Sequence, residues 1–341
     1  MKIALTFNLK PRVRGEPGDS DADLYAEWDD EETISAVHNA LATKHEVILV
    51  EDTCDTESRL QQLRPDIVFN MAEGRGGVER EAHLPAILER CEIPFTGSSS
   101  QTLKLCLDKA ATKRVLLQHG LPTLRSTVVH DLKAIPPTVA VSHSAPLIVK
   151  PLHEGSSKGV YCESVVYDPA GLRKQIVRVI ETYKQPALIE PFITGREFTI
   201  ALLGNGEMVD ILPVVEICFD DLPTAAPPIY SYEAKWIWDQ PDRPLNLLQC
   251  PARLDASLAK NLRHMCRRTF EVLKCRDWCR VDVRLGADDR AYILEVNPLP
   301  GILPDPDRHS SFPIAAMAAG ITYPELVRRV LYHACQRYHL R

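Results

Sequence analysis

Four polar side chains alternate along two apolar segments toward the C-terminal end of the chain. Arg280 and Asp282 lie two positions apart in "CRVDVRL", and Glu295 and Asn297 do so in "AYILEVN". Residues two positions apart on a strand point to one face, so two neighbouring strands would bring all four groups together. The oxygens of Asp282, Glu295 and Asn297 suit a hard cation such as Mg²⁺, which takes a few protein oxygens and keeps waters and phosphate oxygens.

The same pattern has a simpler interpretation. Asp282 and Glu295 could pair with Arg280 as an exposed ladder of ion pairs, and for the pattern alone this is the commoner outcome. The magnesium interpretation gains weight only if phosphate-binding groups occur elsewhere in the chain.

One candidate for such groups is "LIVKPLHEGSSKGV", in which Lys150 ends an expected strand. Gly155, Ser156 and Ser157 in the following loop can offer backbone N–H groups and hydroxyls to a polyphosphate. The segment is not a P-loop, because no Gly-Lys-Ser/Thr follows, and Gly/Ser turns after strands are usually only turns.

A second candidate is the Pro- and aromatic-rich stretch "PPIYSYEAKWIWDQPDRP", which is too polar for core and too long for a tight turn. We expect a mobile flap here, with Trp236 and Trp238 packing the closed lid. Lys235 on the flap and Lys109 at the start of an expected helix could join Lys150 around one triphosphate. Each lysine alone is more commonly a solvated surface charge.

The elements that position these groups follow from hydrophobic periodicity. Apolar, β-branched runs at 2–7, 45–50 and 66–71 predict strands, and apolar residues at helical spacing predict a helix at 30–42. This order begins a parallel α/β domain. Residues 10–23 are rich in charge, Gly and Pro, so we expect a long loop near the end of the first strand, where open α/β sheets bind ligands.

The rest of the chain predicts a lid and a catalytic domain. Strands near 125–130, 147–150 and 187–193 and a helix near 168–183 indicate a small α+β lid. "EFTIALLG" with "MVDILPVVEI", and "CRVDVRL" with "AYILEVN", indicate two antiparallel hairpins. We therefore predict an α/β protein of three domains. Their ranges are 1–108, 109–194 and 195–341.

The composition favours small-molecule partners. The chain has 341 residues, 45% of them hydrophobic, and a net charge of −6. Nucleic acids and anionic membranes usually select a basic surface, so we expect neither as a partner. No run approaches the ~18 apolar residues of a membrane span, and "MKIALTFNL" is too short for a signal peptide, so we expect a cytoplasmic protein. The ten scattered cysteines are then expected to be reduced thiols.

Together these segments closely resemble the ATP-grasp superfamily, and within it the D-alanine–D-alanine ligase family. From about Arg64 onward the family's order and spacing are matched by "FNMAEGRGG", "IPFTGS", "LDKAATKRVLLQHGLPT", "VKPLHEGSSKGV", "IEPFITGREFTIALLG", "YSYEAKW", "CRVDV", "LEVNPLPG" and "AAGITYPELV". So many ordered motifs are very specific. The resemblance implies a three-domain ATP-grasp fold, with an N-terminal parallel α/β domain and ATP held between two α+β domains.

The resemblance also implies how ATP is held. Lys109 and Lys150 would bind its phosphates, and Lys235 would reach the γ-phosphate from the flap. Glu197 would hold the ribose. The adenine hinge would consist of Glu190, Pro191, Phe192 and Ile193. The phosphate loop would consist of Glu154, Gly155, Ser156 and Ser157.

The implied reaction is phosphoryl transfer from ATP to a carboxylate, followed by attack of an amine on the acyl phosphate. The three oxygen-bearing residues named above would hold two Mg²⁺ ions, for which Mn²⁺ could substitute. Arg280 and the backbone N–H of Gly301 would stabilise the oxyanion of the tetrahedral intermediate. Tyr230 and Ser156 would link the flap to the phosphate loop, and the closed flap would keep water from the acyl phosphate.

Both substrate subsites depart from the family pattern. The family's acid that holds the ammonium of the first amino acid is missing, and this chain has "AEWDDEETISAV" instead. Glu27, Asp29 or Glu31 could replace that acid, or could be charges at a helix N-terminus with no ligand role. After Gly301 the chain reads "ILPDPDRHSSFP", longer than the family's segment, and we expect it to form a wall that selects the acceptor. The candidate substrate groups on it are Arg308, His309, Ser310 and Ser311.

We therefore expect an ATP-dependent carboxylate–amine ligase acting on amino acids or an amino-acid-like metabolite in a specialised biosynthetic pathway, with the protein as a homodimer. One alternative is a D-alanine–D-alanine ligase of peptidoglycan synthesis with unusual subsites. The other is a non-catalytic regulatory protein that binds ATP, against which the intact metal and oxyanion residues count.

Overall fold

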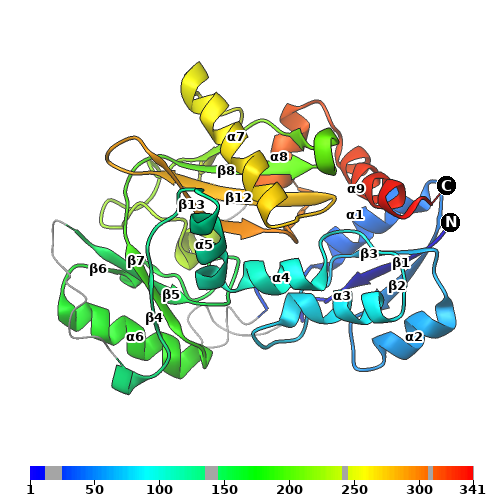
Figure 1. The fold of residues 1–341 in the computed structure, drawn as a ribbon, viewed down its shortest axis with the longest axis horizontal. Helices are drawn as coiled ribbons and strands as arrows, with labels where there is room; N and C mark the ends of the chain where they lie inside the picture. The colour runs from blue at the N-terminus through cyan, green and yellow to red at the C-terminus, as the bar shows by residue number, and fades with distance from the viewer. Residues whose placement is uncertain (12–24, 135–144, 240–244, 306–309, 341) are drawn as a thin grey trace.

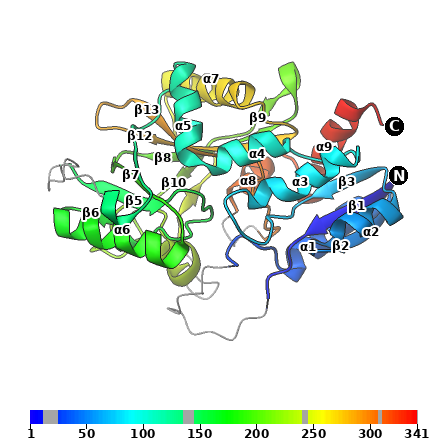
Figure 2. The same cartoon turned by 60° about the horizontal axis from the view of Figure 1, so that its bottom comes forward.

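The described residues form three sheets, and each is built from its own part of the chain. The computed structural model describes residues 1–11, 25–134, 145–239, 245–305 and 310–340. The N-terminal sheet and the lid sheet lie at opposite ends of the molecule, with the C-terminal sheet beside both (Figures 1 and 2). The α/β class expected from the sequence is therefore the one observed, while the boundaries at 108 and 194 stay a prediction.

The first sheet is parallel, as predicted. Its strands are β1 (Lys2–Phe7), β2 (Glu46–Glu51) and β3 (Ile67–Asn70), in the order β2-β1-β3. The helices of this part are α1 (Glu31–Ala42), α2 (Thr56–Leu63), α3 (Arg80–Arg90) and α4 (Ser100–Leu107). Asp30 caps α1 by accepting from the backbone N–H of Thr33 at 2.8 Å.

The second sheet forms the lid. Its strands are β4 (Thr127–Val129), β5 (Leu147–Pro151), β6 (Val165–Val166) and β7 (Ala187–Pro191), paired antiparallel in the order β4-β7-β5-β6. Helix α6 (Pro169–Tyr183) packs Leu172, Ile176 and Val179 against it. Helix α5 (Lys109–Gln118) precedes the lid and ends before Gly120, whose φ is +71°.

The third sheet carries the two predicted hairpins. Its strands are β8 (Glu197–Leu203), β9 (Asp210–Ile211), β10 (Val215–Ile217), β11 (Leu248–Gln249), β12 (Trp278–Leu285) and β13 (Ala291–Asn297). The hairpin of β12 and β13 is confirmed, with a bulge between Asp282 and Val283. In the other, the second run divides into β9 and β10, which both pair with β8. Pro213 lies between them and has no N–H to give to a ladder.

A shared core joins the first and third sheets. Trp278 of β12 is 1% exposed and packs edge-on against Phe69 of β3 and Phe312 of α8 (Ser311–Ala318). Helix α9 (Tyr323–Tyr338) adds apolar residues to the same core, and α7 (Ala256–Val272) covers another face of the third sheet.

The predicted flap contains a short helix of the π type, η4 (Glu233–Trp238). Short 3₁₀ turns also occur at Leu132–Ala134, Cys162–Ser164 and Gly206–Met208. All ten cysteines fall within the described ranges and are free thiols. No helix in the described part of the chain combines the length and apolar character required to cross a bilayer.

Candidate active site

A cavity of about 240 Å³ lies where the lid, the third sheet and the N-terminal loop meet. Its walls include the site residues predicted from the sequence that the structure describes, with the exceptions of Asn297 and Glu31. Asn297 lines a smaller adjoining cavity of about 70 Å³. Arg308 and His309 lie outside the described residues. Sequence reasoning therefore located the cavity, although several side chains in it make contacts that the sequence did not indicate.

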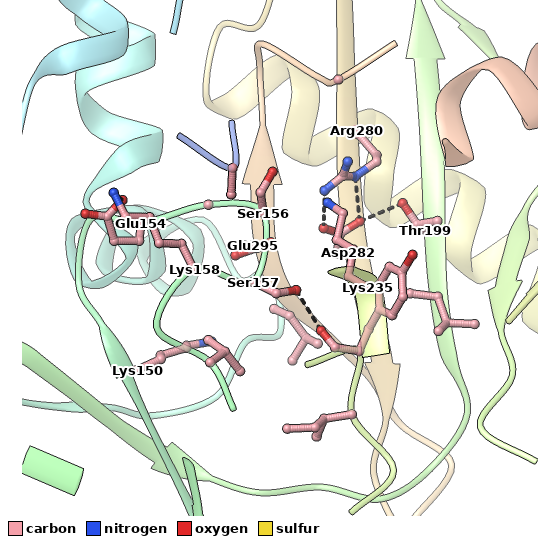
Figure 3. Close-up of a pocket in the computed structure, with 18 of the residues that line it drawn as sticks. Lys150, Glu154, Ser156, Ser157, Lys158, Thr199, Lys235, Arg280, Asp282 and Glu295 are labelled. Atoms are coloured by element: carbon pink, nitrogen blue, oxygen red, sulfur yellow. Dashed lines mark hydrogen bonds and ion pairs between the residues drawn. The ribbon is translucent and has the colours of Figure 1, made fainter. Parts of the chain in front are cut away.

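The four alternating side chains of β12 and β13 converge as predicted. The strand register sets Arg280 opposite Asn297 and Asp282 opposite Glu295. Asn297 Nδ2 donates to Asp282 Oδ2 at 3.0 Å, and Thr199 Oγ1 donates to Asp282 Oδ1 at 2.6 Å. Figure 3 shows Arg280, Asp282 and Thr199 on one wall and the phosphate loop facing them.

The ion pair of the simpler interpretation is also present. Arg280 Nε and Nη2 donate to Asp282 Oδ1 and Oδ2, both at 3.0 Å. The two side chains are only 22% and 12% exposed, so this is a sheltered pair at the base of a cavity and not an exposed ladder. Arg280 is thereby held with its guanidinium beside the carboxylates.

The carboxylates of this wall suit a metal ion. Burial alone would raise the pKa of Glu295, but Lys109, Lys150 and Arg280 hold it at about 2, so the group stays charged. Lys109 Nζ lies 3.7 Å from Glu295 Oε2. No set of three or more His, Cys, Asp and Glu side chains within the described ranges is arranged to hold a metal, so the candidate set consists of two carboxylates and the Asn297 amide. Such a hard oxygen set fits Mg²⁺ that also binds phosphate.

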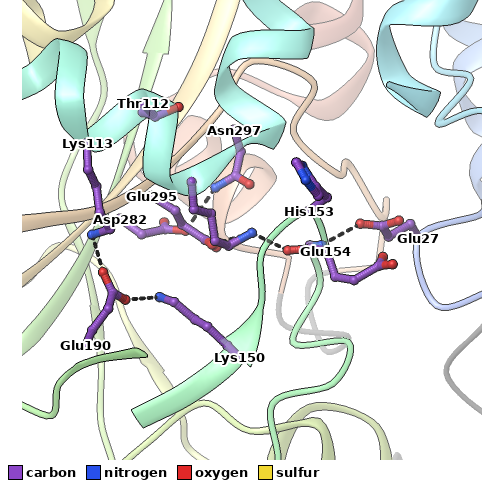
Figure 4. A network of polar contacts seen from close by, with 12 residues as sticks. Glu27, Thr112, Lys113, Lys150, His153, Glu154, Glu190, Asp282, Glu295 and Asn297 are labelled. Atoms are coloured by element: carbon purple, nitrogen blue, oxygen red, sulfur yellow. Dashed lines mark hydrogen bonds and ion pairs between the residues drawn. The ribbon is translucent and has the colours of Figure 1, made fainter. Parts of the chain in front are cut away.

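A second charged cluster lies on the lid side. The carboxylate of Glu190 is 1% exposed and contacts Lys113 Nζ at 2.6 Å and Lys150 Nζ at 2.7 Å. Burial would raise the pKa of Glu190, but these lysines lower it; its carboxylate in turn raises the pKa of Lys150 despite burial. Figure 4 shows the Glu190 carboxylate between the ammonium groups of Lys113 and Lys150. Sequence reasoning missed Lys113, although its spacing of four from Lys109 on one helix was a usable signal.

Glu197 lies farther along the same wall. Its carboxylate accepts from Arg284 Nη1 at 2.9 Å. Burial raises the pKa of Glu197 to about 7, because Arg284 offsets it only in part and the nearby Asp282 and Glu295 add to the rise. Pro191, Phe192 and Ile193 continue the wall as a mainly apolar strip.

The phosphate loop has an unusual backbone. Ser156 and Ser157 have φ of +48° and +61°, the left-handed region that non-glycine residues rarely adopt. Neither backbone N–H has a hydrogen-bond partner among the residues that the structure describes. Two consecutive N–H groups in such a turn make a concavity that favours an anion.

The flap contacts this loop in a way that differs from the predicted Tyr230–Ser156 link. Ser157 Oγ donates to the backbone carbonyl of Tyr230 at 2.7 Å, and Trp236 Nε1 donates to the carbonyl of Ser156 at 3.2 Å. The half-buried Tyr230 lines the cavity, and partial removal from water raises the pKa of its hydroxyl. Trp236 therefore makes the side-chain contact that had been assigned to tyrosine, because indole N–H reaches the loop carbonyl.

Lys235 points into the cavity from the flap (Figure 3). Burial and the neighbouring Arg280 lower the pKa of Lys235 to about 8. Its Nζ and that of Lys10, from the N-terminal part, lie 5.1 and 4.8 Å from the ring centre of Trp236. The indole of Trp236 therefore contacts the N-terminal part through Lys10 and the lid through the Ser156 carbonyl.

The acids of the N-terminal segment occupy different positions. Glu27 reaches the cavity, but its carboxylate is bound by Arg80, a residue that the sequence reasoning missed. Asp29 also lines the cavity, and burial and Asp30 raise its pKa to about 8. Glu31 lies in the first turn of α1, where it is a helix N-terminal charge.

The segment after Gly301 ends the cavity on the remaining side. Ser310 Oγ donates to the Gly301 carbonyl at 3.3 Å, and Ser310 and Ser311 both line the cavity.

Glu154 of the predicted phosphate loop is held by its backbone and its side chain. Lys109 Nζ donates to its carbonyl, and its carboxylate contacts Gln185 and Arg80.

The chain is similar to known proteins along most of its length. Residues 119–332 match the family model described as D-ala D-ala ligase C-terminus. The uncharacterized protein y4sG of Sinorhizobium fredii is 35% identical over 310 residues, which cover 86% of this chain and 84% of that protein. The D-alanine–D-alanine ligase of Bordetella petrii is 34% identical over 304 residues, covering 89% and 86%.

A solved structure agrees on the fold. The crystal structure of D-alanine–D-alanine ligase from Bacillus anthracis complexed with ATP aligns over 99% of both chains, with a TM-score of 0.72 and 20% identity. The ATP-grasp fold expected from the sequence motifs is thereby confirmed. Because the family model matches more than half of the chain and the relatives cover most of it, the protein belongs to the D-alanine–D-alanine ligase-like family of the ATP-grasp superfamily, a family of ADP-forming ligases.

Proposed function

We propose that the protein joins a carboxylate to an amine through an acyl phosphate, with ATP converted to ADP and phosphate. One observation carries the proposal. A single cavity brings together the ammonium groups of Lys109, Lys150 and Lys235 and a wall of charged oxygens. The backbone N–H groups of Ser156 and Ser157, which have no partner in the described part of the chain, belong to the same cavity. Few ligands other than a nucleoside triphosphate with its metal ion need ammonium groups, free backbone N–H groups and carboxylates in one place.

The lining of the cavity suggests how a nucleotide would lie in it. The apolar strip at Phe192 and Ile193 suits an adenine ring, and Glu197 beside it can accept from ribose hydroxyls. The phosphates would then extend toward the lysines. The Bacillus anthracis protein of the same fold was solved in complex with ATP, which supports ATP as the ligand.

Asp282, Glu295 and Asn297 would hold Mg²⁺, which supplies charge neutralisation for the moving phosphoryl group. The lysines add fixed positive charge around the same phosphates and keep them in place. Lys235 approaches from the flap, so its ammonium reaches the phosphates only when the flap is closed.

The acyl transfer would follow at the other end of the wall. Arg280 is held in place by its bidentate pair with Asp282 and can stabilise the oxyanion that forms when the amine attacks, together with the Gly301 N–H. Trp236 closes the flap onto the phosphate loop, which excludes water from the acyl phosphate.

Two choices of substrate are supported by different observations. D-Alanine as both donor and acceptor is favoured by relatives named D-alanine–D-alanine ligase, such as those of Bordetella petrii and Pelotomaculum thermopropionicum, the latter 32% identical over 317 residues. A different amino-acid pair in a specialised pathway is favoured by the residues at the two proposed substrate subsites. Glu27 already has a cationic partner in Arg80, and residues 302–312 depart from the family's segment.

Release of ADP separates these choices. The protein is incubated with ATP, Mg²⁺ and single or paired amino acids, and Asp282→Asn serves as the inactive control. Highest release with D-alanine alone identifies the peptidoglycan substrate, whereas another pair identifies the specialised one. No release with any member of a broad acid and amine panel would overturn the ligase proposal in favour of a regulatory ATP-binding protein.

The acceptor wall has its own test. Ser310 and Ser311 are the described polar groups of the segment after Gly301 that face the cavity. With the active pair from the screen, Ser310→Ala is expected to raise the KM of the acceptor and leave that of ATP unchanged. An unchanged acceptor KM would remove Ser310 from the wall.

A further inference from the structure

A buried ion pair connects two segments of the N-terminal part. Arg80 at the start of α3 donates from Nε to Glu27 Oε2 at 3.0 Å and from Nη2 to Glu27 Oε1 at 2.7 Å. The two side chains are 6% and 9% exposed. Such a bidentate contact fixes the orientation of both partners.

The same pair also holds the phosphate loop of the lid. Arg80 Nη1 donates to the carbonyl of His153 at 2.6 Å, and the backbone N–H of Gly155 donates to Glu27 Oε1 at 2.9 Å. Arg80 Nη2 lies 3.3 Å from Glu154 Oε2 as well. Figure 4 shows Glu27, His153 and Glu154 gathered at one end of the network. Three consecutive residues of the lid are thus bound by two side chains of another part of the chain.

The loop is shaped to accept this contact. A Cβ added to Gly155 would lie 2.5 Å from Glu27 Oε1, so any other residue would displace the carboxylate. The next two residues, Ser156 and Ser157, line the cavity and have the left-handed backbone of the anion-binding turn. The contact therefore ends where the anion-binding turn begins.

The charges of the pair are already satisfied. Burial would raise the pKa of Glu27, but Arg80, Lys158 and the Gly155 N–H lower it, so the carboxylate is charged and surrounded by donors. A substrate ammonium at this carboxylate would have to compete with a guanidinium that contacts both of its oxygens. The geometry does not favour Glu27 as the residue that binds a substrate amine.

We propose that Arg80 and Glu27 are positioning residues for ATP: together they hold residues 153–155 so that the N–H groups of Ser156 and Ser157 face the nucleotide phosphates. The inference rests on the proposed function only in that ATP is the ligand of the loop. Both side chains contact the loop directly, so the proposed effect on ATP passes through the loop backbone.

Equilibrium binding of ATP with Mg²⁺, measured by calorimetry, tests the pair in Arg80→Gln, Glu27→Gln and the double variant. Each single variant is expected to weaken ATP binding about tenfold, and the double variant little further, because removing either partner releases the same loop. Arg80→Lys keeps the charge without the two-pronged geometry and is expected to recover part of the affinity.

The matched control is Arg90→Gln on the same helix. Arg90 pairs with Glu57 at 2.7 Å, but its side chain is 60% exposed and far from the cavity. The ATP affinity of Arg90→Gln should equal that of the wild type. Thermal unfolding of every variant shows whether the fold is kept, and Glu27→Gln, which conserves shape, carries the test if Arg80→Gln does not fold.

Three results would overturn the pair as a positioning device. One is wild-type ATP affinity in both single variants, another is additive losses in the double variant, and the third is a Glu27→Gln effect confined to the KM of an amino-acid substrate. Weakened ATP binding in both single variants of a protein that releases no ADP would support the pair while refuting the ligase activity. A wild type that binds no ATP would refute both.

Discussion

The charge of Lys235 is expected to change within an ordinary range of pH. Removal from water and the nearby positive charge of Arg280 lower the pKa of the Lys235 ammonium to about 8. A lysine with a lowered pKa keeps its charge below that value and loses it as pH rises through it. Above about pH 8 the flap would therefore bring a neutral amine to the phosphates.

The pH dependence of kcat/KM for ATP reports this group, because that ratio reflects ionisations of the free enzyme. We expect the wild-type ratio to fall above about pH 8. Lys235→Arg should lower the ratio at neutral pH but remove this fall, since guanidinium stays charged. An identical alkaline fall in both proteins would show that another group titrates.

The wall of β12 and β13 gives a prediction about the metal. Asp282→Asn and Glu295→Gln should each lower the rate of ADP release by about 100-fold or more, because each removes a charged oxygen from the proposed Mg²⁺ set. Circular dichroism should show the fold intact. Asp289→Asn, in the exposed turn of the same hairpin, should leave the rate unchanged. Near-normal rates in either wall variant would return Asp282 to a purely ion-pairing role.

Residues that follow a local rule could be predicted from the sequence. The convergence of Arg280, Asp282 and Asn297 follows from the alternation of strand side chains, which needs no tertiary information. The pair of Arg80 and Glu27 joins residues 53 positions apart and depends on how two loops meet. No periodicity or spacing carries that information.

At the scale of elements, the loop between β5 and β6 depends on its glycines. Gly159 has a φ of +75°, and a Cβ there would lie 2.3 Å from Pro151 Cγ. Gly120 after α5 has a similar φ of +71°, with nothing within 4 Å of an added Cβ. The two glycines therefore share the backbone requirement and differ in the space around them.

Replacing each glycine by alanine separates these effects. Gly159→Ala should displace the phosphate loop and raise the KM of ATP about tenfold, because the loop amides lose their positions. Gly120→Ala should cost about 1 kcal/mol of unfolding free energy without changing that KM. Equal KM values in the two variants would contradict a loop held in place by its backbone geometry.

Element positions were predicted well where periodicity is strong and less well where it is interrupted. The strands of the first sheet and the β12–β13 hairpin lie where the sequence placed them. The division into β9 and β10 around Pro213 and the helix η4 within the flap were not foreseen. The division follows from Pro213, which interrupts the alternating run and could have been read from the sequence. The residues of η4 lie in a polar stretch without periodicity, which gave no signal for a helix.

For the whole molecule, one buried carboxylate joins three parts of the chain. Asp277 is 0% exposed and accepts from the Gly97 N–H at 2.7 Å, from Asn205 Nδ2 at 2.8 Å and from Arg337 Nη2 at 2.7 Å. These partners belong to the segment before α4, the β8–β9 turn and the C-terminal helix α9.

Asp277→Ala should lower the free energy of unfolding by about 3–5 kcal/mol, because Arg337, only 17% exposed, would lose its counter-ion and the Gly97 N–H its acceptor. Denaturant unfolding measures the change. Asp210→Ala, at an exposed position of β9, is the control and should stay within about 0.5 kcal/mol of the wild type. A loss for Asp277→Ala no larger than that of the control would mean that the junction adds little to stability.

The movement of one oxygen atom tests the acyl phosphate most directly. The acid substrate found in the ADP screen is labelled with ¹⁸O in its carboxylate, and the inorganic phosphate released with the amide product is analysed by mass spectrometry. Because the carboxylate oxygen that attacks ATP leaves with the phosphate when the amine displaces it, we predict one ¹⁸O atom in each phosphate released. Unlabelled phosphate alongside stoichiometric amide and ADP would contradict an acyl phosphate.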